Sequence, residues 1–551
     1  MSSTATVSAR HAPSPEASES TLHDTWTLLR FMLRRDRIRL TLWVLGIGVM
    51  AFYFANAIQG IAEDEAELAQ MAGMFTDPVG RLMTGPAFGM DEPTFERFFS
   101  AGYVLFIYIL IALMSVFTLV RHTRAEEQTG RAELVRANVV GRHATLTAAL
   151  LLVAAANAAT AVLVCLAALV GGFDPAGTVL VAAAGAGVGL FFSGAAAITA
   201  QLSESSRGAS GMAGGLIGLS YVIRMGGDMA EQGGNALSWF SPLGWSQQTA
   251  PYVEDRWGPV LLLIGGAALL VLLGYWLSTK RDVGASLMPT RPGRRDARPA
   301  LGTPVGVAAR VLRGGLRAWG IALVLSGMMF GGYAQALVDA AGDLPEEFAQ
   351  IFTGESIMLG YMACMAVFMA LFTAAAGVSA LTQMRGEEVR GRAELTLSAP
   401  VGRTGWLAAH LSVLLVGLAL ILVLVGLGTA AAAVAVLEDD GDYFGELLLA
   451  TIHQGPAVLA VVGIVVALFG WFPRAASLVG WLIIGYCAFM TNFGRLLEVP
   501  ELMHDANLFG HLAEYPVEEV SWTPVLVLTG LGLVGILIGF VGWNRREINR
   551  A

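Results

Sequence analysis

Twelve stretches of this chain are long and apolar enough to cross a lipid bilayer as helices. The hydrocarbon core of a bilayer is about 30 Å thick, and roughly 20 apolar residues in a helix span it. Composition agrees, because 55% of the 551 residues are hydrophobic and 14% are charged, whereas roughly a quarter are charged in soluble domains. We therefore predict an all-α integral membrane protein with twelve transmembrane helices. The predicted spans are 39–59, 99–120, 143–171, 177–200, 208–227, 258–279, 316–337, 357–383, 404–436, 446–470, 475–493 and 524–544.

A charged loop follows the second span and recurs after the eighth. The first copy, residues 124–142, is called here the first elbow, and the second copy, residues 385–403, is called the second elbow. The two copies align without a gap at an offset of 261 residues, so the chain is predicted to be a tandem duplication of a six-helix half. Both contain the pattern Glu-Glu-x-x-Gly-Arg-x-Glu-Leu. Its charged residues and glycine are Glu126, Glu127, Gly130, Arg131 and Glu133 in the first elbow, and Glu387, Glu388, Gly391, Arg392 and Glu394 in the second.

The distribution of cations predicts the orientation. With both termini in the cytoplasm, 29 of the 34 Lys and Arg residues fall in cytoplasmic segments, and only Arg81, Arg97, Arg224, Arg256 and Arg495 remain outside or within the membrane. Cytoplasmic loops of membrane proteins carry such an excess. We expect a multi-pass protein of the bacterial plasma membrane. The net charge of −9 does not indicate a nucleic-acid partner, because the basic groups are spread over loops where they can contact anionic lipids.

Four segments are predicted along the chain. Residues 1–21 contain no apolar core of a signal peptide and are expected to be a disordered cytosolic tail. Residues 22–279 form the first six-helix half, which opens with a basic amphipathic helix expected to lie in the membrane interface. Residues 280–304, rich in Pro and Arg, are a cytoplasmic linker, and residues 305–551 form the second half.

Catalytic and nucleotide-binding motifs are missing from the sequence. A P-loop needs a lysine after glycine, but the one lysine, Lys280, follows Thr279. The eight histidines are scattered and the three cysteines lie in predicted spans, so no metal site is predicted. Every Asp and Glu lies in a loop or at the edge of a span, which argues against a proton-coupled carrier. The chain is expected not to be an enzyme and to hold no cofactor itself.

Aromatic segments precede the last span of each half on the predicted outer side. Trp and Tyr favour the membrane boundary, so these segments are either interfacial anchors or an extracellular lid. Arg224 lies one helical turn before Asp228, which suits an ion pair, with a gating role as the alternative. The candidate gate residues are Arg224, Trp239, Phe240, Trp245 and Phe509.

At the two elbows the chain resembles the permease subunits of type-2 ABC exporters. The resemblance is to the actinobacterial branch with two fused six-helix halves, often described as tetronasin or polyketide antibiotic exporters, and it covers nearly the whole chain. It also rests on Ser241-Pro242-Leu-Gly244-Trp245 and on Arg281-Asp282-Val-Gly284. The second half departs from both motifs, with Phe509-Gly-His511 and with Arg545-Arg546-Glu547-Ile548.

The resemblance implies that each elbow is a coupling helix seated in a groove of a separate ATPase. One permease chain would bind a homodimer of cytoplasmic ABC ATPase subunits, which hold ATP and Mg. The Glu and Arg of each elbow lie four or five residues apart, which favours a short helix, and the carboxylates are expected to remain exposed toward a basic groove. Gly130 and Gly391 would end or bend that helix. The alternative is a solvated loop whose charges only follow topology.

The resemblance also implies alternating access, with substrate passing between the halves along spans two and five of each. The predicted path residues are aromatic in span two and form a methionine stripe in span eight; thioethers suit varied apolar ligands. Helix packing is the alternative role for both sets. The residues are Phe99, Tyr103, Phe106, Met358, Met362, Met365 and Met369.

The predicted function is therefore that of a permease for an ATP-driven exporter of amphipathic or hydrophobic compounds such as antibiotics and drugs. Membrane lipids and a small amphipathic substrate are the other expected partners. Export of lipids or cell-envelope components by the same fold is one alternative. A gradient-driven secondary carrier is an alternative of another class, and a membrane enzyme is a third for which no convincing set of polar groups exists.

Overall fold

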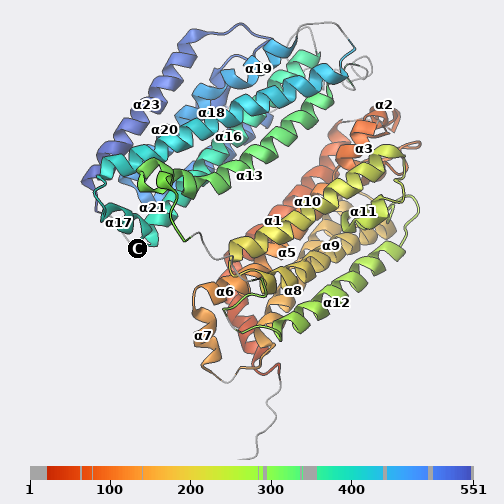
Figure 1. The fold of residues 1–551 in the computed structure, drawn as a ribbon. Coiled ribbons are helices and arrows are strands. Elements are labelled where there is room, and N and C mark those ends of the chain that lie inside the picture. The colour runs from red at the N-terminus through yellow and green to blue at the C-terminus, as the bar shows by residue number, and fades with distance from the viewer. Residues whose placement is uncertain are drawn as a thin grey trace, which may run out of the picture. The chain divides into compact units, whose positions relative to one another are not determined.

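The computed structural model describes two compact units (Figure 1), with the boundary between them at Pro292 and Gly293. Each unit is a bundle of long helices, and every regular element in the described part of the chain is helical. The all-α class predicted from the apolar stretches is thereby confirmed. The described residues are 21–61, 65–76, 78–138, 140–282, 284–288, 295–335, 338, 357–438, 443–493 and 500–547.

The first unit combines long apolar helices with short ones in the connections between them. Its elements are α1 (Thr25–Ile61), α2 (Glu65–Thr76), α3 (Pro78–Thr84), α4 (Phe95–Gly102), α5 (Val104–His122), α6 (Arg124–Gln128), α7 (Arg131–Arg136), α8 (Ala144–Val170), α9 (Pro175–Leu202), α10 (Ser206–Ala230), η1 (Ser238–Phe240), α11 (Pro242–Gln247) and α12 (Gly258–Ser278).

The second unit has the same kind of construction. Its elements are η2 (Pro299–Gly302), α13 (Pro304–Gly332), α16 (Ile357–Val389), α17 (Arg392–Leu397), α18 (Arg403–Val436), α19 (Tyr443–His453), α20 (Gly455–Trp471), α21 (Pro473–Phe493), α22 (Glu501–Asp505), η3 (Leu508–His511) and α23 (Trp522–Arg545).

Eleven helical segments among the described residues are long and apolar enough to cross a membrane, one fewer than the sequence predicts. The missing one is the predicted span 208–227. It is helical, as α10, and its 25 residues are sufficient in length. However, α10 contains seven glycines together with Arg224 and Asp228, which lower its hydropathy below that of the other spans.

The predicted interfacial helix at the start of the first half is not a separate element. Residues 25–61 form one continuous helix, α1, and the basic segment is its first few turns. No glycine or proline interrupts the stretch from Thr25 to Leu45, so nothing in the backbone separates the basic turns from the apolar turns.

Equivalent helices pack together in the two units. In the first unit α1 packs along α8, and α9 packs against both α12 and α5. In the second unit α13 packs along α18, and α20 packs against both α23 and α16. The repeated pairing extends the similarity of the two elbows to the helices around them.

The α20–α23 contact is close because glycines face one another across it. A β-carbon added at Gly463 would lie 2.2 Å from the carbonyl oxygen of Gly532, and one added at Gly470 would lie 2.3 Å from that of Gly539. Small residues allow membrane helices to approach until their backbones touch. The α23 glycines of this contact therefore serve packing within the second unit.

Two sequence predictions fall largely or partly outside the described residues. The tail 1–21 is described only at Thr21. The linker 280–304 is described except at 283 and 289–294.

Candidate functional site

Each elbow is a helix–turn–helix at one end of its unit. In the first elbow α6 and α7 are separated by Gly130, and in the second the end of α16 is separated from α17 by Gly391. Both glycines have a left-handed backbone, with φ of 74° and 71°. An L-residue with a side chain is strained in this conformation, and the prediction that both glycines end a helix is confirmed.

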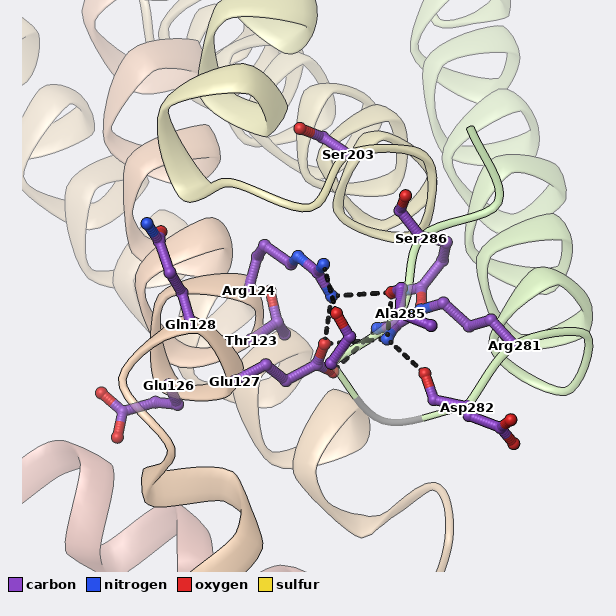
Figure 2. A network of polar contacts seen from close by, with 12 residues as sticks. Thr123, Arg124, Glu126, Glu127, Gln128, Ser203, Arg281, Asp282, Ala285 and Ser286 are labelled. Atoms are coloured by element: carbon purple, nitrogen blue, oxygen red, sulfur yellow. Dashed lines mark hydrogen bonds and ion pairs between the residues drawn. The ribbon is translucent and has the colours of Figure 1, made fainter. Parts of the chain in front are cut away.

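Glu127 of the first elbow is held between two arginines (Figure 2). Arg281, which follows α12, donates to both carboxylate oxygens at 2.7 and 2.8 Å. Arg124, with 1% of its side chain exposed, donates to the same carboxylate and to the carbonyls of Gly284 and Ala285 at 3.0 Å. We call this arrangement the first clamp; it joins the elbow to the end of the last helix of the unit.

Glu388 of the second elbow has the same environment, called here the second clamp. Arg385 lies 2.8 Å from one of its oxygens, and Arg546, directly after α23, pairs with both. The Arg546 guanidinium also lies 4.7 Å from the Trp543 ring centroid, a cation–π distance. The Glu388 side chain has no exposed surface.

The clamp arginines Arg281 and Arg546 were missed by sequence reasoning. The 261-residue offset pairs Arg281 with Gly542, so a gapless alignment does not bring the two arginines together. Their guanidinium groups reach equivalent carboxylates from different positions, because Arg281 lies three residues beyond its helix and Arg546 lies one residue beyond. The signal was present as a cation after the last span of each half.

The carboxylates preceding the clamps also have partners within the chain. Glu126 lies 2.8 Å from Arg35 of α1 and 3.8 Å from Arg131. Glu387 accepts from the Arg392 Nε at 2.7 Å, and this hydrogen bond raises the pKa of Arg392 above its ordinary value.

The expectation that four elbow carboxylates remain exposed for a basic partner is therefore wrong. Their side chains are between 0% and 16% exposed. The arginines that neutralise them are intramolecular, because burying a carboxylate without a partner is costly. The four residues are Glu126, Glu127, Glu387 and Glu388.

A pair of leucines forms the exposed part of the elbows instead. Leu134 of α7 is 72% exposed and Leu395 of α17 is 74% exposed, and they occupy equivalent positions at the 261-residue offset. Glu133, beside Leu134, is exposed, whereas Glu394 is half-buried and has interactions of its own. The leucines belong to the repeated motif, in which only the charged residues and the glycine were predicted to be functional.

A second polar cluster surrounds Arg224 of α10. Arg224 lies 3.1 Å from Asp228 and donates to the Leu82 carbonyl at 2.7 Å, and Ser238 donates to the other Asp228 oxygen at 2.6 Å. Arg224 is 0% and Asp228 1% exposed. The predicted ion pair is confirmed, and it fastens α10 to α3 and η1.

The aromatic gate candidates lie in very different environments. Phe240 is 75% exposed and Trp239 is 41% exposed, whereas Phe509 is buried. Trp245 is half-buried and donates its ring N–H to the Trp239 carbonyl at 2.6 Å. The predicted outer segment before α12 contains η1 and α11, and the one before α23 contains η3. A lid role for these segments stays a prediction.

The methionine stripe of α16 lies mostly in the core of the second unit. Met358 and Met362 are buried beside Ala430 and Ala433 of α18, and Met365 packs against the same cluster. Met369 belongs to a neighbouring cluster with Leu323 and Val425. These contacts are those of helix packing within one unit.

The span-two aromatics do not share a common surface. The helix is interrupted at Tyr103, between α4 and α5. Phe99 is buried against Phe173, Tyr103 stacks on Phe54 with ring centroids 4.5 Å apart, and Phe106 is 38% exposed. A role for any of them in a substrate path stays a prediction.

The described residues contain no group of three or more His, Cys, Asp or Glu side chains able to hold a metal ion.

What the helices and elbows define is a multi-pass membrane protein with a repeated helical unit. The family described as multidrug efflux system permease Rv1217c, C-terminal domain, matches residues 27–277 and 301–544. The multidrug efflux system permease protein Rv1217c of Mycobacterium tuberculosis (strain ATCC 25618 / H37Rv) is 34% identical over 529 residues, which are 95% of each chain. The chain belongs to this family of multidrug efflux permeases.

Proposed function

We propose that this chain is the membrane permease of an ATP-driven exporter of amphipathic and hydrophobic compounds. A separate homodimer of ABC ATPase subunits, holding ATP and Mg, would dock on the two elbows from the cytoplasm. The family of multidrug efflux permeases supports the substrate class. The proposal of an external energy source rests on the sequence, whose one lysine does not occur in a P-loop.

The repeated exposed leucine is the observation that carries the docking proposal. Leu134 and Leu395 each project from a short helix that follows a left-handed glycine, at the same position of both elbows. A single exposed leucine is ordinary on a protein surface. Its exact repetition at two elbows suits a partner with two equivalent apolar pockets.

The two clamps supply a route by which movement of the elbows reaches the helices. Glu127 connects the first elbow to Arg281 after α12, and Glu388 connects the second to Arg546 after α23. Because a buried bidentate pair is costly to break, a displaced elbow would move with the end of the last helix of its unit. Closure of the ATPase dimer would thereby change the packing of each bundle. The substrate path would then open alternately to the two sides of the membrane.

Exchange of both exposed leucines for aspartate tests the docking proposal. The tagged full chain is purified from native membranes, and the ATPase recovered with it is quantified for the wild type and for Leu134→Asp with Leu395→Asp. Because a central anchor residue that fills a pocket contributes about 2 kcal/mol or more to binding, we expect recovery to fall at least about tenfold.

Leu502→Asp is the matched control, because Leu502 is 78% exposed on α22 and lies outside the elbows. It should leave ATPase recovery unchanged. Undiminished recovery in the double leucine variant would remove the proposed docking surface. Transport by the purified chain alone, driven by a proton or sodium gradient after ATP depletion, would instead favour a secondary carrier.

A further inference from the structure

A long groove runs between α13 and α18 of the second unit. It has a volume of about 700 Å³, within the size range of small-molecule sites. Its lining is apolar apart from Ser412 and two arginines, Arg313 and Arg317. The apolar part extends from Leu316 to Leu325, about 14 Å along α13 at 1.5 Å per residue.

One end of this groove opens into a basic hollow of about 730 Å³. The groove and the hollow share Ala309, Arg313 and Arg317, so they form one continuous concavity. The hollow is lined by five arginines and a single acid, Asp296. The five arginines are Arg295, Arg298, Arg310, Arg313 and Arg317.

Asp296 is the one acid among the described residues that line the hollow, and it forms no ion pair with the five arginines. All five are exposed, and within the described ranges none forms an ion pair. The corresponding helix of the first unit differs, because on α1 Arg35 pairs with Glu126, and Asp36 pairs with Arg121 at 2.8 Å. Within the described part of the chain, helix α1 also has exposed arginines without an ion pair, such as Arg34 and Arg37, so what sets α13 apart is that its unpaired arginines line a hollow continuous with an apolar groove.

We propose that the α13–α18 groove is a binding site for one anionic phospholipid. The acyl chain would lie along Leu316, Ile321 and Leu420, and the phosphate would lie between Arg313 and Arg317 at the basic end. An anionic headgroup supplies the charge that the arginines lack, and each basic residue near such a surface contributes favourably. The lipid would be a resident ligand of the second unit, independent of which compound is exported.

The two parts of the site together favour a phospholipid over other ligands. A free phosphate would occupy the basic hollow but would gain nothing from the apolar groove. A neutral lipid would fill the groove but leave five guanidinium groups without a counter-charge. Only a molecule with a fixed anion at one end of a long apolar tail satisfies both regions.

Lipid binding to the full chain tests this proposal. The protein is delipidated in neutral detergent and titrated with dioleoyl phosphatidylglycerol or dioleoyl phosphatidylcholine, and bound lipid is counted by native mass spectrometry. We expect tight binding of one phosphatidylglycerol. Arg313→Gln with Arg317→Gln should weaken it roughly thirtyfold, from the usual contribution of two basic residues.

Two further variants separate the groove from simple surface charge. Val416→Trp fills the groove from a residue that is 60% exposed, and it should also abolish tight binding. Arg34→Gln with Arg37→Gln removes two exposed cations from α1 and should change nothing. Inorganic phosphate at millimolar concentration should not displace the lipid.

The proposal is overturned if phosphatidylcholine binds as tightly as phosphatidylglycerol, or if either groove variant binds like the wild type. It is also overturned if the α1 variant loses as much binding as the α13 variant, which would indicate unspecific attraction to charge. Displacement of the lipid by inorganic phosphate would also overturn it, because the site would then bind anions without using the apolar groove. Absence of lipid binding by the wild type would show that another part of the chain covers the groove.

Discussion

Glu388 shows how closely a single side chain is tied to the structure around it. Its carboxylate has no exposed surface and is bound by Arg385 and Arg546. Replacing an ion pair by apolar residues of similar volume is often tolerated, whereas removing one partner leaves an uncompensated charge. Substitutions in the clamps should therefore act first on stability, and only then on coupling to any partner.

Glu388→Gln should destabilise the protein by about 3 kcal/mol, because two arginines lose their counter-charge in a buried site. The midpoint of thermal denaturation in detergent is the measurement. Glu133→Gln, which changes an exposed carboxylate of the first elbow, should alter stability by less than about 0.5 kcal/mol. Equal midpoints for the two variants would mean that the second clamp contributes no stability.

The buried pair of Arg224 and Asp228 should show strong coupling in a double-mutant cycle. Arg224→Met alone leaves Asp228 buried with Ser238 as a remaining donor, at a cost of about 3–5 kcal/mol. Arg224→Met combined with Asp228→Leu should cost less than the single change. Additive effects in denaturation midpoints would show that the two side chains do not stabilise each other.

At the scale of the helix, the α20–α23 contact depends on the absence of side chains. A β-carbon at Gly539 would lie 2.5 Å from the Val466 carbonyl oxygen, whereas one at Gly530 of the same helix meets nothing within 4 Å. The two glycines thus form a matched pair for measuring how much the close approach of α20 and α23 contributes to the stability of the second unit.

Gly539→Val should separate α20 from α23. It should lower the free energy of unfolding by more than the usual cost of overpacking, which is about 1–3 kcal/mol. Gly530→Val should be tolerated, since its side chain would point into open space. Folded yield and denaturation midpoint of both variants are the readouts. A Gly539→Val protein as stable as Gly530→Val would contradict the packing described for this contact.

The helices could largely be predicted from hydropathy, whereas their interruptions and contacts could not. Eleven of the predicted spans correspond to candidate membrane helices, because twenty apolar residues have few other stable environments. The merging of the basic segment into α1 follows from the absence of Gly and Pro between Thr25 and Leu45. The break at Tyr103, which stacks on Phe54 of α1, depends instead on contacts between helices. Likewise, the elbow charges were identified correctly in sequence, but their partner Arg546 lies 158 residues from Glu388 and no local pattern connects them.

For the whole molecule, the main question is whether the two units are used equally. Their helix pairs and clamps correspond. However, the Arg546 guanidinium of the second clamp lies against aromatic rings, and the α13–α18 groove with its basic hollow belongs to the second unit. Under the two proposals above, both elbows bind the same type of partner, whereas the lipid site belongs to the second unit alone.

Each elbow should be needed for coupling on its own. Leu134→Asp alone and Leu395→Asp alone should each reduce drug-stimulated ATPase activity of the reconstituted complex by about tenfold, because a dimer held at one point loses much of the gain from bivalent attachment. The measurement compares both variants with Leu502→Asp. If one of the two retained full stimulation, only the other elbow would transmit energy.

The polar character of α10 has a consequence for how the protein is made. A segment with seven glycines, a buried arginine and a buried aspartate gains too little from lipid to remain in the bilayer when it first leaves the translocon. Arg224 and Asp228 of α10 pair with each other, and their further hydrogen bonds are to α3 and η1. Of these elements, η1 is synthesised after α10. We expect α10 to be the last helix of its unit to settle, and nascent chains that end before residue 240 to leave it exposed to membrane quality-control proteases.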